Sequence, residues 1–266
     1  MNTTKYIPFD CIAPNIIALR EQKEFPGAFG TGFFCVFPPY DYVFYITARH
    51  CVVSLFSENS DASLQIPIKN NCNKAVSFCC GLETNINNCP TEEREDIVVF
   101  VVDRNMDTAD YNTLIKRSLR LLHQDEIDRI LELGAVRGER LRAVGFPTHD
   151  HPNCKTEIDY VKQEGRFQPR GFHGVLLNDG RFPNQYVIQN TNWTEGEYRG
   201  FSGSPVIALA PLLEKPDQIV PIPVGIILMA SGNVARFLSI NVATNLIATF
   251  LKEQIADGII EEIPEY

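Results

Sequence analysis

A glycine-rich turn around Ser202 constrains the fold of this chain more than any other segment; its sequence is Arg-Gly-Phe-Ser-Gly-Ser-Pro-Val at residues 199–206. Glycines on both sides of a serine let the backbone turn tightly and approach a substrate closely. In such a turn the amides of Gly200 and Ser202 can both point at a developing oxyanion. Ordinary loops share this composition, so the turn indicates catalysis only if the chain also supplies a base and an orienting acid.

The order of the histidines relative to Ser202 excludes one fold. All of them precede the serine: His50, His123, His149, His151 and His173. A nucleophile elbow of the α/β-hydrolase type needs Gly-x-Ser-x-Gly with its histidine downstream. Here Ser204 stands in place of the last glycine and no histidine follows. The order histidine, aspartate, serine stays open.

Short apolar segments separated by Gly, Pro, Asn and Asp predict an all-β fold. Residues 33–37 and 42–47 predict a hairpin that ends just before His50, and residues 96–103 predict a strand buried on both faces. Further strands are predicted at 64–68, 76–78, 141–145, 157–161, 174–177, 185–189, 204–209, 224–229 and 237–241. Residues 1–25 are expected to form an N-terminal arm, residues 105–133 helical segments, and residues 243–252 an amphipathic helix.

The net charge of −9 and the pI of about 5.1 argue against nucleic acid as a partner, because a basic surface is lacking. The first residues have neither a basic region nor an apolar core typical of a signal peptide. The longest apolar stretch, residues 222–230, is about half of what a membrane span needs. We therefore expect a cytoplasmic protein with no membrane partner, whose eight cysteines are reduced.

Two clusters of metal-binding residue types are present, but we predict no metal site at either. Cys72, Cys79, Cys80 and Cys89 lack the Cys-x2–4-Cys pairing of a zinc ribbon. The second cluster lies in a loop and consists of His149, Asp150, His151 and Cys154.

Three segments in order resemble the signature motifs of trypsin-like, chymotrypsin-fold serine peptidases. Residues 47–51 (Thr-Ala-Arg-His-Cys) resemble Thr/Ser-Ala-Ala-His-Cys, residues 96–99 (Asp-Ile-Val-Val) resemble Asp-Ile-Ala-Leu, and residues 200–205 resemble Gly-Asp-Ser-Gly-Gly-Pro. Residues 30–33 (Gly-Thr-Gly-Phe) and 141–147, which end in Gly-Phe-Pro, are similar to segments of the bacterial heat-shock branch of that family. The resemblance spans roughly residues 27 to 250.

The resemblance implies a fold and a division of the chain. The fold class is all-β, with two six-stranded antiparallel Greek-key barrels, a connecting helical segment and a C-terminal helix. The whole chain, residues 1–266, is then one peptidase domain. Its parts are an N-terminal lobe at about 27–115, a helical connector at about 116–137, a C-terminal lobe at about 138–242 and the helix at 243–252.

The resemblance also implies a role for each motif residue. His50 is the general base, Asp96 orients it, Ser202 is the nucleophile, and the amides of Gly200 and Ser202 form the oxyanion hole. Glu95 is a competing acid, but on a strand its side chain would face the other way. The implied activity is serine endopeptidase hydrolysis of protein or peptide substrates through an acyl-enzyme, without a cofactor.

Two departures from the family pattern bear on activation and specificity. Phe201 replaces the aspartate that pairs with a new N-terminal amine in activated zymogens, and an Ile-Val-Gly-Gly start is lacking, so activation of the pancreatic type is not expected. Gly196 carries no acid where trypsin-like enzymes bind Lys or Arg. By resemblance, Leu228, Met229 and Ala230 would pair with an extended substrate, and Phe237 would line a shallow pocket for small apolar side chains.

Two alternatives to the endopeptidase remain: a catalytically silent binding module on the same fold, and an esterase or self-processing enzyme of narrow specificity. Regulation would come from the N-terminal arm, a loop or a partner chain. Cys35 and Cys51 have a spacing similar to that of a disulfide in secreted members, although reduced thiols are expected in the cytosol.

Overall fold

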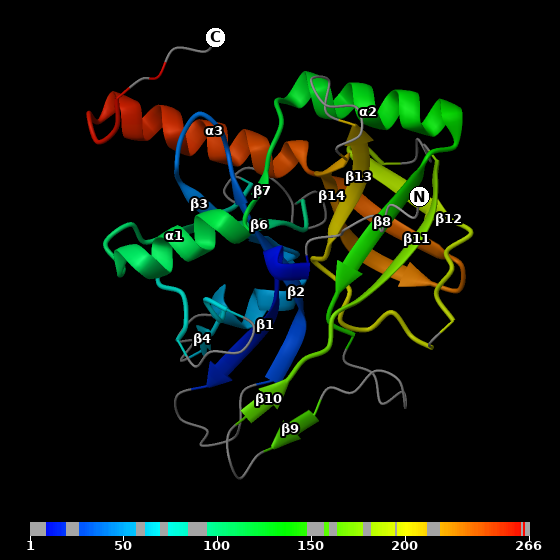
Figure 1. Cartoon of the computed structure of the whole chain (residues 1–266), viewed down its shortest axis with the longest axis horizontal. Coiled ribbons are helices and arrows are strands. Elements are labelled where there is room, and N and C mark those ends of the chain that lie inside the picture. The colour runs from blue at the N-terminus through cyan, green and yellow to red at the C-terminus, as the bar shows by residue number, and fades with distance from the viewer. Residues whose placement is uncertain are drawn as a thin grey trace.

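Two antiparallel β-structures lie side by side, and helices run along one edge of both (Figure 1). The computed structural model describes residues 9–19, 27–56, 62–69, 74–84, 95–147, 157–159, 164–177, 182–194, 196–211, 219–261 and 263. All statements on structure below concern these residues.

The first sheet carries strands in the order β4-β1-β2-β3-β6-β5, and β7 pairs in parallel with β2. Its strands are β1 (Ile12–Leu19), β2 (Gly27–Val36), β3 (Val43–Thr47), β4 (Ala62–Leu64), β5 (Phe78–Leu82), β6 (Val98–Val102) and β7 (Leu119–Arg120). Every residue of β3 and β6 is buried, as their aromatic and β-branched composition predicts. These two strands form the centre of the first lobe.

The second sheet closes into a six-stranded barrel in the order β11-β12-β15-β14-β13-β8. Its strands are β8 (Arg140–Gly145), β11 (Arg170–Leu177), β12 (Gln185–Gln189), β13 (Pro205–Pro211), β14 (Ile219–Ser231) and β15 (Val234–Ser239). A separate ribbon of β9 (Glu157–Asp159) and β10 (Glu164–Arg166) extends away from it (Figure 1). Two short 3-10 helices, η1 (Phe9–Cys11) and η2 (Arg49–Phe56), belong to the first lobe.

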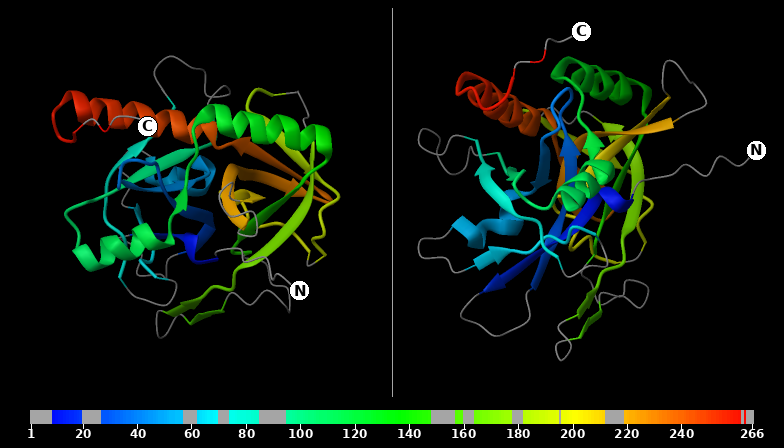
Figure 2. Two further views of the ribbon diagram at one scale, coloured as in Figure 1. Left: turned by 45° about the horizontal axis from the view of Figure 1, so that its top comes forward. Right: turned by 60° about the vertical axis from the view of Figure 1, so that its left-hand side comes forward.

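Helices join and cover the two lobes. α1 (Thr108–Arg117) and α2 (Gln124–Arg137) lie between the sheets in sequence, and α3 (Asn241–Ala256) follows the last strand. α3 leaves the second barrel and crosses to the first sheet (Figure 2). There the Phe250 ring lies 5.8 Å from that of Tyr42 and 6.2 Å from that of Phe44. The C-terminal helix thereby fastens one lobe to the other. None of the described helices has the length and apolar character that a membrane span requires.

The prediction of an N-terminal arm is wrong for residues 12–19. They form β1, which pairs with β2 and β4 and buries Asn15 completely. β1 contains Pro14 and a bulge between Pro14 and Ile16, so the period-2 pattern that identifies a strand is interrupted. Several strand bounds also differ from the predictions. The strands expected at 64–68 and 76–78 lie instead at Ala62–Leu64 and Phe78–Leu82. β14 begins at Ile219, before the expected 224, and β15 ends at Ser239, after which α3 begins at Asn241.

Candidate active site

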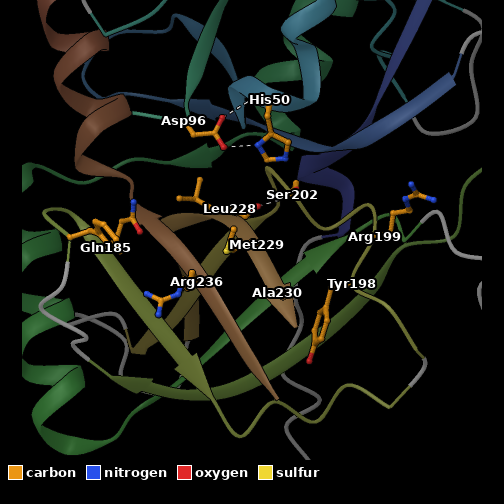
Figure 3. Close-up of a pocket in the computed structure, with 11 residues that line it drawn as sticks. His50, Asp96, Gln185, Tyr198, Arg199, Ser202, Leu228, Met229, Ala230 and Arg236 are labelled. Atoms are coloured by element: carbon orange, nitrogen blue, oxygen red, sulfur yellow. Dashed lines mark hydrogen bonds and ion pairs between the residues drawn. The ribbon is translucent and has the colours of Figure 1, made fainter. Parts of the chain in front are cut away.

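A cavity of about 800 Å³ lies where the two lobes meet, and it contains the three residues of the predicted triad (Figure 3). His50 and Asp96 come from the first lobe and Ser202 from the second. The other lining residues also belong to the second lobe: Phe182, Gln185, Tyr198, Arg199, Leu228, Met229, Ala230 and Arg236.

His50 is held at the end of a buried strand. β3 ends at Thr47, Ala48 is fully buried, and η2 begins at Arg49, so the imidazole is presented at the point where the chain leaves the sheet. The Cys51 amide donates to the Ala48 carbonyl at 3.1 Å and tightens this turn. Because the strand is fixed by its neighbours on both sides, the position of the histidine is determined by the sheet.

Asp96 contacts His50 with both carboxylate oxygens. His50 Nδ1 lies 2.5 Å from Asp96 Oδ2, and the His50 amide donates to Asp96 Oδ1 at 2.8 Å (Figure 3). The hydrogen bond that His50 donates to this carboxylate raises the pKa of His50 to about 10. Burial alone would raise the pKa of Asp96, but the contacts with His50 outweigh it and lower that pKa. The pair fixes the imidazole with Nδ1 as the donor, which leaves Nε2 free to accept a proton.

Glu95, the competing acid, points elsewhere. Its carboxylate accepts a hydrogen bond from Asn184 Nδ2 of the second lobe at 3.3 Å. The two acids lie in a tight turn before β6, closed by the Ile97 amide donating to the Glu95 carbonyl at 2.9 Å, and their carboxylates contact different partners.

Two glycines allow the turn that carries Ser202. Gly200 and Gly203 have φ angles of 95° and 81°, a region that other residues rarely adopt. At Gly203 a β-carbon would also overlap the Thr31 carbonyl and the Thr47 hydroxyl. The turn is therefore pressed against the first lobe at a point where no side chain fits.

The hydroxyl of Ser202 donates to the Leu228 carbonyl at 3.1 Å. Among the described residues, no hydrogen bond joins Ser202 Oγ to His50. Catalytic hydrogen bonds are often long in unliganded enzymes and tighten only when substrate is bound. Attack on a substrate would thus begin with a rotation of the Ser202 side chain away from Leu228 and toward His50.

Three backbone amides of the turn donate hydrogen bonds to residues that the structure describes, and two do not. Phe201 donates to Tyr198, Gly203 to Ile227 and Ser204 to Phe201, at 2.7–3.0 Å. Within the described part of the chain, the amides of Gly200 and Ser202 have no acceptor. These are the two groups that the sequence predicts to form an oxyanion hole.

Thr31 of β2 holds the Ser202 turn from the opposite lobe, a role that sequence reasoning missed. Its amide donates to the Ser202 carbonyl at 2.9 Å, and its hydroxyl donates to the Gly200 carbonyl at 2.8 Å. The same hydroxyl accepts from the Phe146 amide at 2.9 Å. Thr31 is fully buried, so these bonds are shielded from water.

A buried polar chain supports Thr31 from behind. The Thr47 hydroxyl donates to the Thr31 carbonyl at 2.8 Å, and Asn15 Nδ2 donates to the Thr47 hydroxyl at 2.8 Å. Asn15 Oδ1 in turn accepts from the Tyr45 hydroxyl at 2.8 Å. β1, the segment predicted as an arm, therefore contributes to the support of the serine turn.

Phe201 anchors the turn on the side of the second barrel. Its side chain is fully buried, and its ring meets those of Trp193 at 5.0 Å, Phe172 at 5.1 Å and Tyr198 at 6.2 Å. Edge-to-face packing of this kind adds to the stabilisation from burial. An aromatic cluster thus occupies the place where the resembling zymogens use an ion pair.

The structure changes part of the predicted specificity pocket. Leu228, Met229 and Ala230 line the cavity, as expected. Phe237 does not: it is fully buried, and its ring stacks on Tyr186 at 5.5 Å. Its neighbour Arg236 lines the cavity instead, because successive side chains on a strand face opposite sides.

Gly196 is also absent from the lining residues. It lies in an exposed turn, where its carbonyl accepts a hydrogen bond from the Trp193 indole at 3.0 Å. Glu197 is exposed and Glu195 lies outside the described residues. Neither Gly196 nor Glu197 contributes to the cavity wall.

Cys35 and Cys51 carry free thiols in the structure. Cys51 Sγ contacts the Ser202 carbonyl at 3.6 Å, and Cys35 is fully buried in β2, which raises the pKa of its thiol. The described residues contain no group of three or more side chains that could hold a metal ion. Of the cysteine cluster only Cys79 and Cys80 are described, and the four residues of the histidine-rich cluster lie outside the described part.

Comparisons with known proteins support the fold and go no further. No protein-family model and no curated protein matches the sequence. The structure is similar to that of a mutant of human heparin-binding protein (CAP37), with a TM-score of 0.55 and 14% identity over 93% of this chain and 95% of that chain. At this identity the likeness shows architecture alone, and it confirms the predicted all-β, chymotrypsin-like fold.

Proposed function

We propose that the protein is a serine endopeptidase. The observation that carries this proposal is the bidentate contact of Asp96 with His50 in the cavity that also contains the Ser202 hydroxyl. A base, an acid that orients it and a nucleophile on a tight glycine turn are the groups that acyl transfer requires.

Ser202, His50 and Asp96 would carry out the proposed acyl transfer in two stages. As Ser202 Oγ bonds to the scissile carbonyl carbon, its proton passes to His50 Nε2, and the carbonyl oxygen becomes an oxyanion beside the Gly200 and Ser202 amides. The imidazolium next to Asp96 then gives its proton to the leaving amine as the C–N bond breaks. Water then bonds to the acyl carbon as His50 takes its proton, and when the ester C–O bond breaks the imidazolium protonates Ser202 Oγ and the acid product leaves.

An open strand edge is suited to hold the substrate main chain. β13 pairs with β14 only as far as Ile226, so Met229 and Ala230 pair with β15 alone among the described residues. Met229 is 62% exposed. An extended peptide added to this edge would lie with its carbonyl next to Ser202.

A fluorophosphonate probe tests the proposal directly, since it labels only an activated serine. We expect the wild-type chain to be labelled and Ser202→Ala to remain unlabelled. Casein and peptide turnover, compared with turnover of simple esters, separates the endopeptidase from an esterase. Absence of labelling of the wild type, or equal labelling of Ser202→Ala, would defeat the proposal.

A non-catalytic binding module is the second candidate, because the Ser202 hydroxyl donates to Leu228 and not to His50. The similar structure also belongs to a protein named for binding heparin. Heparin is a polyanion, however, and the net charge of −9 here disfavours the same ligand. A folded chain that binds peptides but never labels with the probe would favour this candidate.

Removal of the Thr31 hydroxyl tests whether the interlobe contact positions the serine turn. In Thr31→Val the Gly200 carbonyl and the Phe146 amide each lose a buried partner, at about 1–3 kcal/mol per group. Because the Gly200 carbonyl fixes the conformation of the residue whose amide is proposed for the oxyanion hole, we expect kcat to fall about 10- to 100-fold with KM changed less than about threefold.

Two further variants separate positioning from general stability. Thr31→Ser keeps the hydroxyl and should restore most of kcat. Thr244→Val removes another buried threonine hydroxyl, one that bonds only within α3, and should leave kcat unchanged. Equal losses of kcat in Thr31→Val and Thr244→Val at matched thermal stability would contradict a positioning role.

The proposal also covers the branch of the family, the location of the protein, its partners and its regulation. Membership of the heat-shock branch is supported by the segments at 30–33 and 141–147. A cytoplasmic location and the absence of nucleic-acid or membrane partners are supported by the composition. A partner chain or a loop remains the proposed route of regulation.

A further inference from the structure

We infer that the cavity selects peptides with an acidic side chain, Asp or Glu, at the residue that supplies the scissile carbonyl, and that Arg236 binds the carboxylate. This inference rests on the proposed endopeptidase function and names its substrate class. It replaces the sequence-based expectation of small apolar side chains, which depended on Phe237.

The sheet register brings Arg236 close to the nucleophile. Arg236 of β15 is paired with Met229 of β14, next to Leu228, whose carbonyl accepts from Ser202 Oγ at 3.1 Å. The bulge between Ile227 and Met229 leaves Leu228 outside the ladder and turned to the serine. Figure 3 shows the guanidinium below Leu228 and Met229, on the side of the cavity away from Arg199. A side chain extending from the attacked carbonyl past Leu228 would meet it.

The lining of the cavity favours an anion. Its charged residues are Arg199, Arg236, His50 and Asp96, and both oxygens of Asp96 are already engaged by His50. A substrate lysine or arginine would therefore find no second carboxylate among the described lining residues. This local cationic lining contrasts with the net charge of −9 of the whole chain.

The donors around Arg236 suit a carboxylate. A guanidinium carries five N–H donors in a planar fork that matches a carboxylate in a bidentate manner. It can therefore bind a substrate while keeping a contact within the protein. Gln185 faces the same side of the sheet, since it pairs with Leu238, two residues beyond Arg236, and it also lines the cavity. Its amide can donate a further hydrogen bond.

The experiment uses quenched peptides that are identical except for Glu, Asp, Gln, Leu or Lys before the scissile bond. For the full-length wild type we expect kcat/KM at least about tenfold higher for Glu or Asp than for Gln, as charge-assisted hydrogen bonds allow. Arg236→Gln should bring this ratio within about threefold, and Arg236→Lys should retain part of it. Arg236→Glu should shift the preference to Lys.

Two other arginines serve as controls. Arg199→Gln removes the other guanidinium of the cavity, and Arg129→Gln removes the same charge from the exposed face of α2. The acid preference should persist in both. Loss of the preference in Arg199→Gln but not in Arg236→Gln would overturn the assignment, as would a wild type that prefers Leu or Lys.

Two experimental outcomes distinguish a wrong assignment of Arg236 from a wrong assignment of peptidase activity. Fluorophosphonate labelling with peptide turnover but no acid preference would overturn the inference on Arg236 and leave the peptidase intact. A chain that neither labels nor cleaves any peptide would overturn the peptidase and, with it, the selectivity in cleavage.

Discussion

Replacement of Asp96 by asparagine should lower kcat by about 10⁴-fold while the protein stays folded, as the same change does in the serine-triad template. The reason lies in the hydrogen bond at His50 Nδ1, which is 2.5 Å from Asp96 Oδ2. An amide can place its NH₂ group at this position, and it would then favour the tautomer with the proton on Nε2. That tautomer cannot accept the proton of Ser202.

The pH dependence of activity is a second measurement that tests the role of Asp96. The Asp96 carboxylate raises the pKa of His50 to about 10, and a general base works only in its neutral form. Activity of the wild type should therefore fall as the pH is lowered through a midpoint well above the ordinary value of about 6.5. In Asp96→Asn the main cause of the shift is removed, so the midpoint of the residual activity should move toward that value.

Glu95→Gln is the matched control for Asp96→Asn. It removes the same charge from the adjacent residue, whose carboxylate contacts Asn184 and not His50. We expect kcat within about threefold of the wild type and an unchanged midpoint. Equal losses of kcat in the two variants would show that Asp96 does not orient the base, and a wild-type midpoint at or below 6.5 would show that it does not raise the pKa of the base.

The three residues of the proposed triad could be selected from the sequence because each of them lies in a local motif. His50 follows a buried strand, Asp96 precedes one, and Ser202 lies between glycines; strand ends and turns of this kind are visible in a few residues of sequence. The fold of each lobe was accessible for the same reason, since alternating and continuous apolar runs identify strands without knowledge of their partners.

The remaining features depend on pairing and register, which a sequence does not display. Whether Phe237 or Arg236 lines the cavity depends on which face of β15 is turned toward it. A shift of the strand register by one residue would exchange the two side chains. The contact of Thr31 with Gly200 joins residues 169 positions apart. Asn15 was missed because Pro14 and the bulge conceal its strand. A prediction from motifs alone therefore finds the reacting groups but not the residues that position them.

Phe201→Asp would create the Gly-Asp-Ser-Gly sequence of the peptidases that this segment resembles, yet we expect it to destabilise the protein severely and to abolish activity. Loss of a fully buried phenyl group typically costs about 3–5 kcal/mol. Burial of the new carboxyl among apolar rings adds a further cost of several kcal/mol, because the group must be desolvated or neutralised there. The sum is comparable with the whole stability of many domains, about 5–15 kcal/mol.

The surroundings of Phe201 explain why an aspartate at this position should destabilise the protein. Of the polar atoms in the aromatic cluster, the Trp193 indole already donates to Gly196, and the Tyr198 hydroxyl is engaged with Thr191 and Gly232. A carboxylate could therefore gain hydrogen bonds only by breaking existing ones.

Thermal unfolding measures the loss of stability in Phe201→Asp. Phe201→Leu keeps the site apolar, so it should lose far less stability and retain labelling by the fluorophosphonate. If Phe201→Asp instead matched the wild type in both assays, an ion pair could replace the aromatic anchor. The cluster would then be dispensable for holding the serine turn, and the resemblance in sequence would be the better guide to this position.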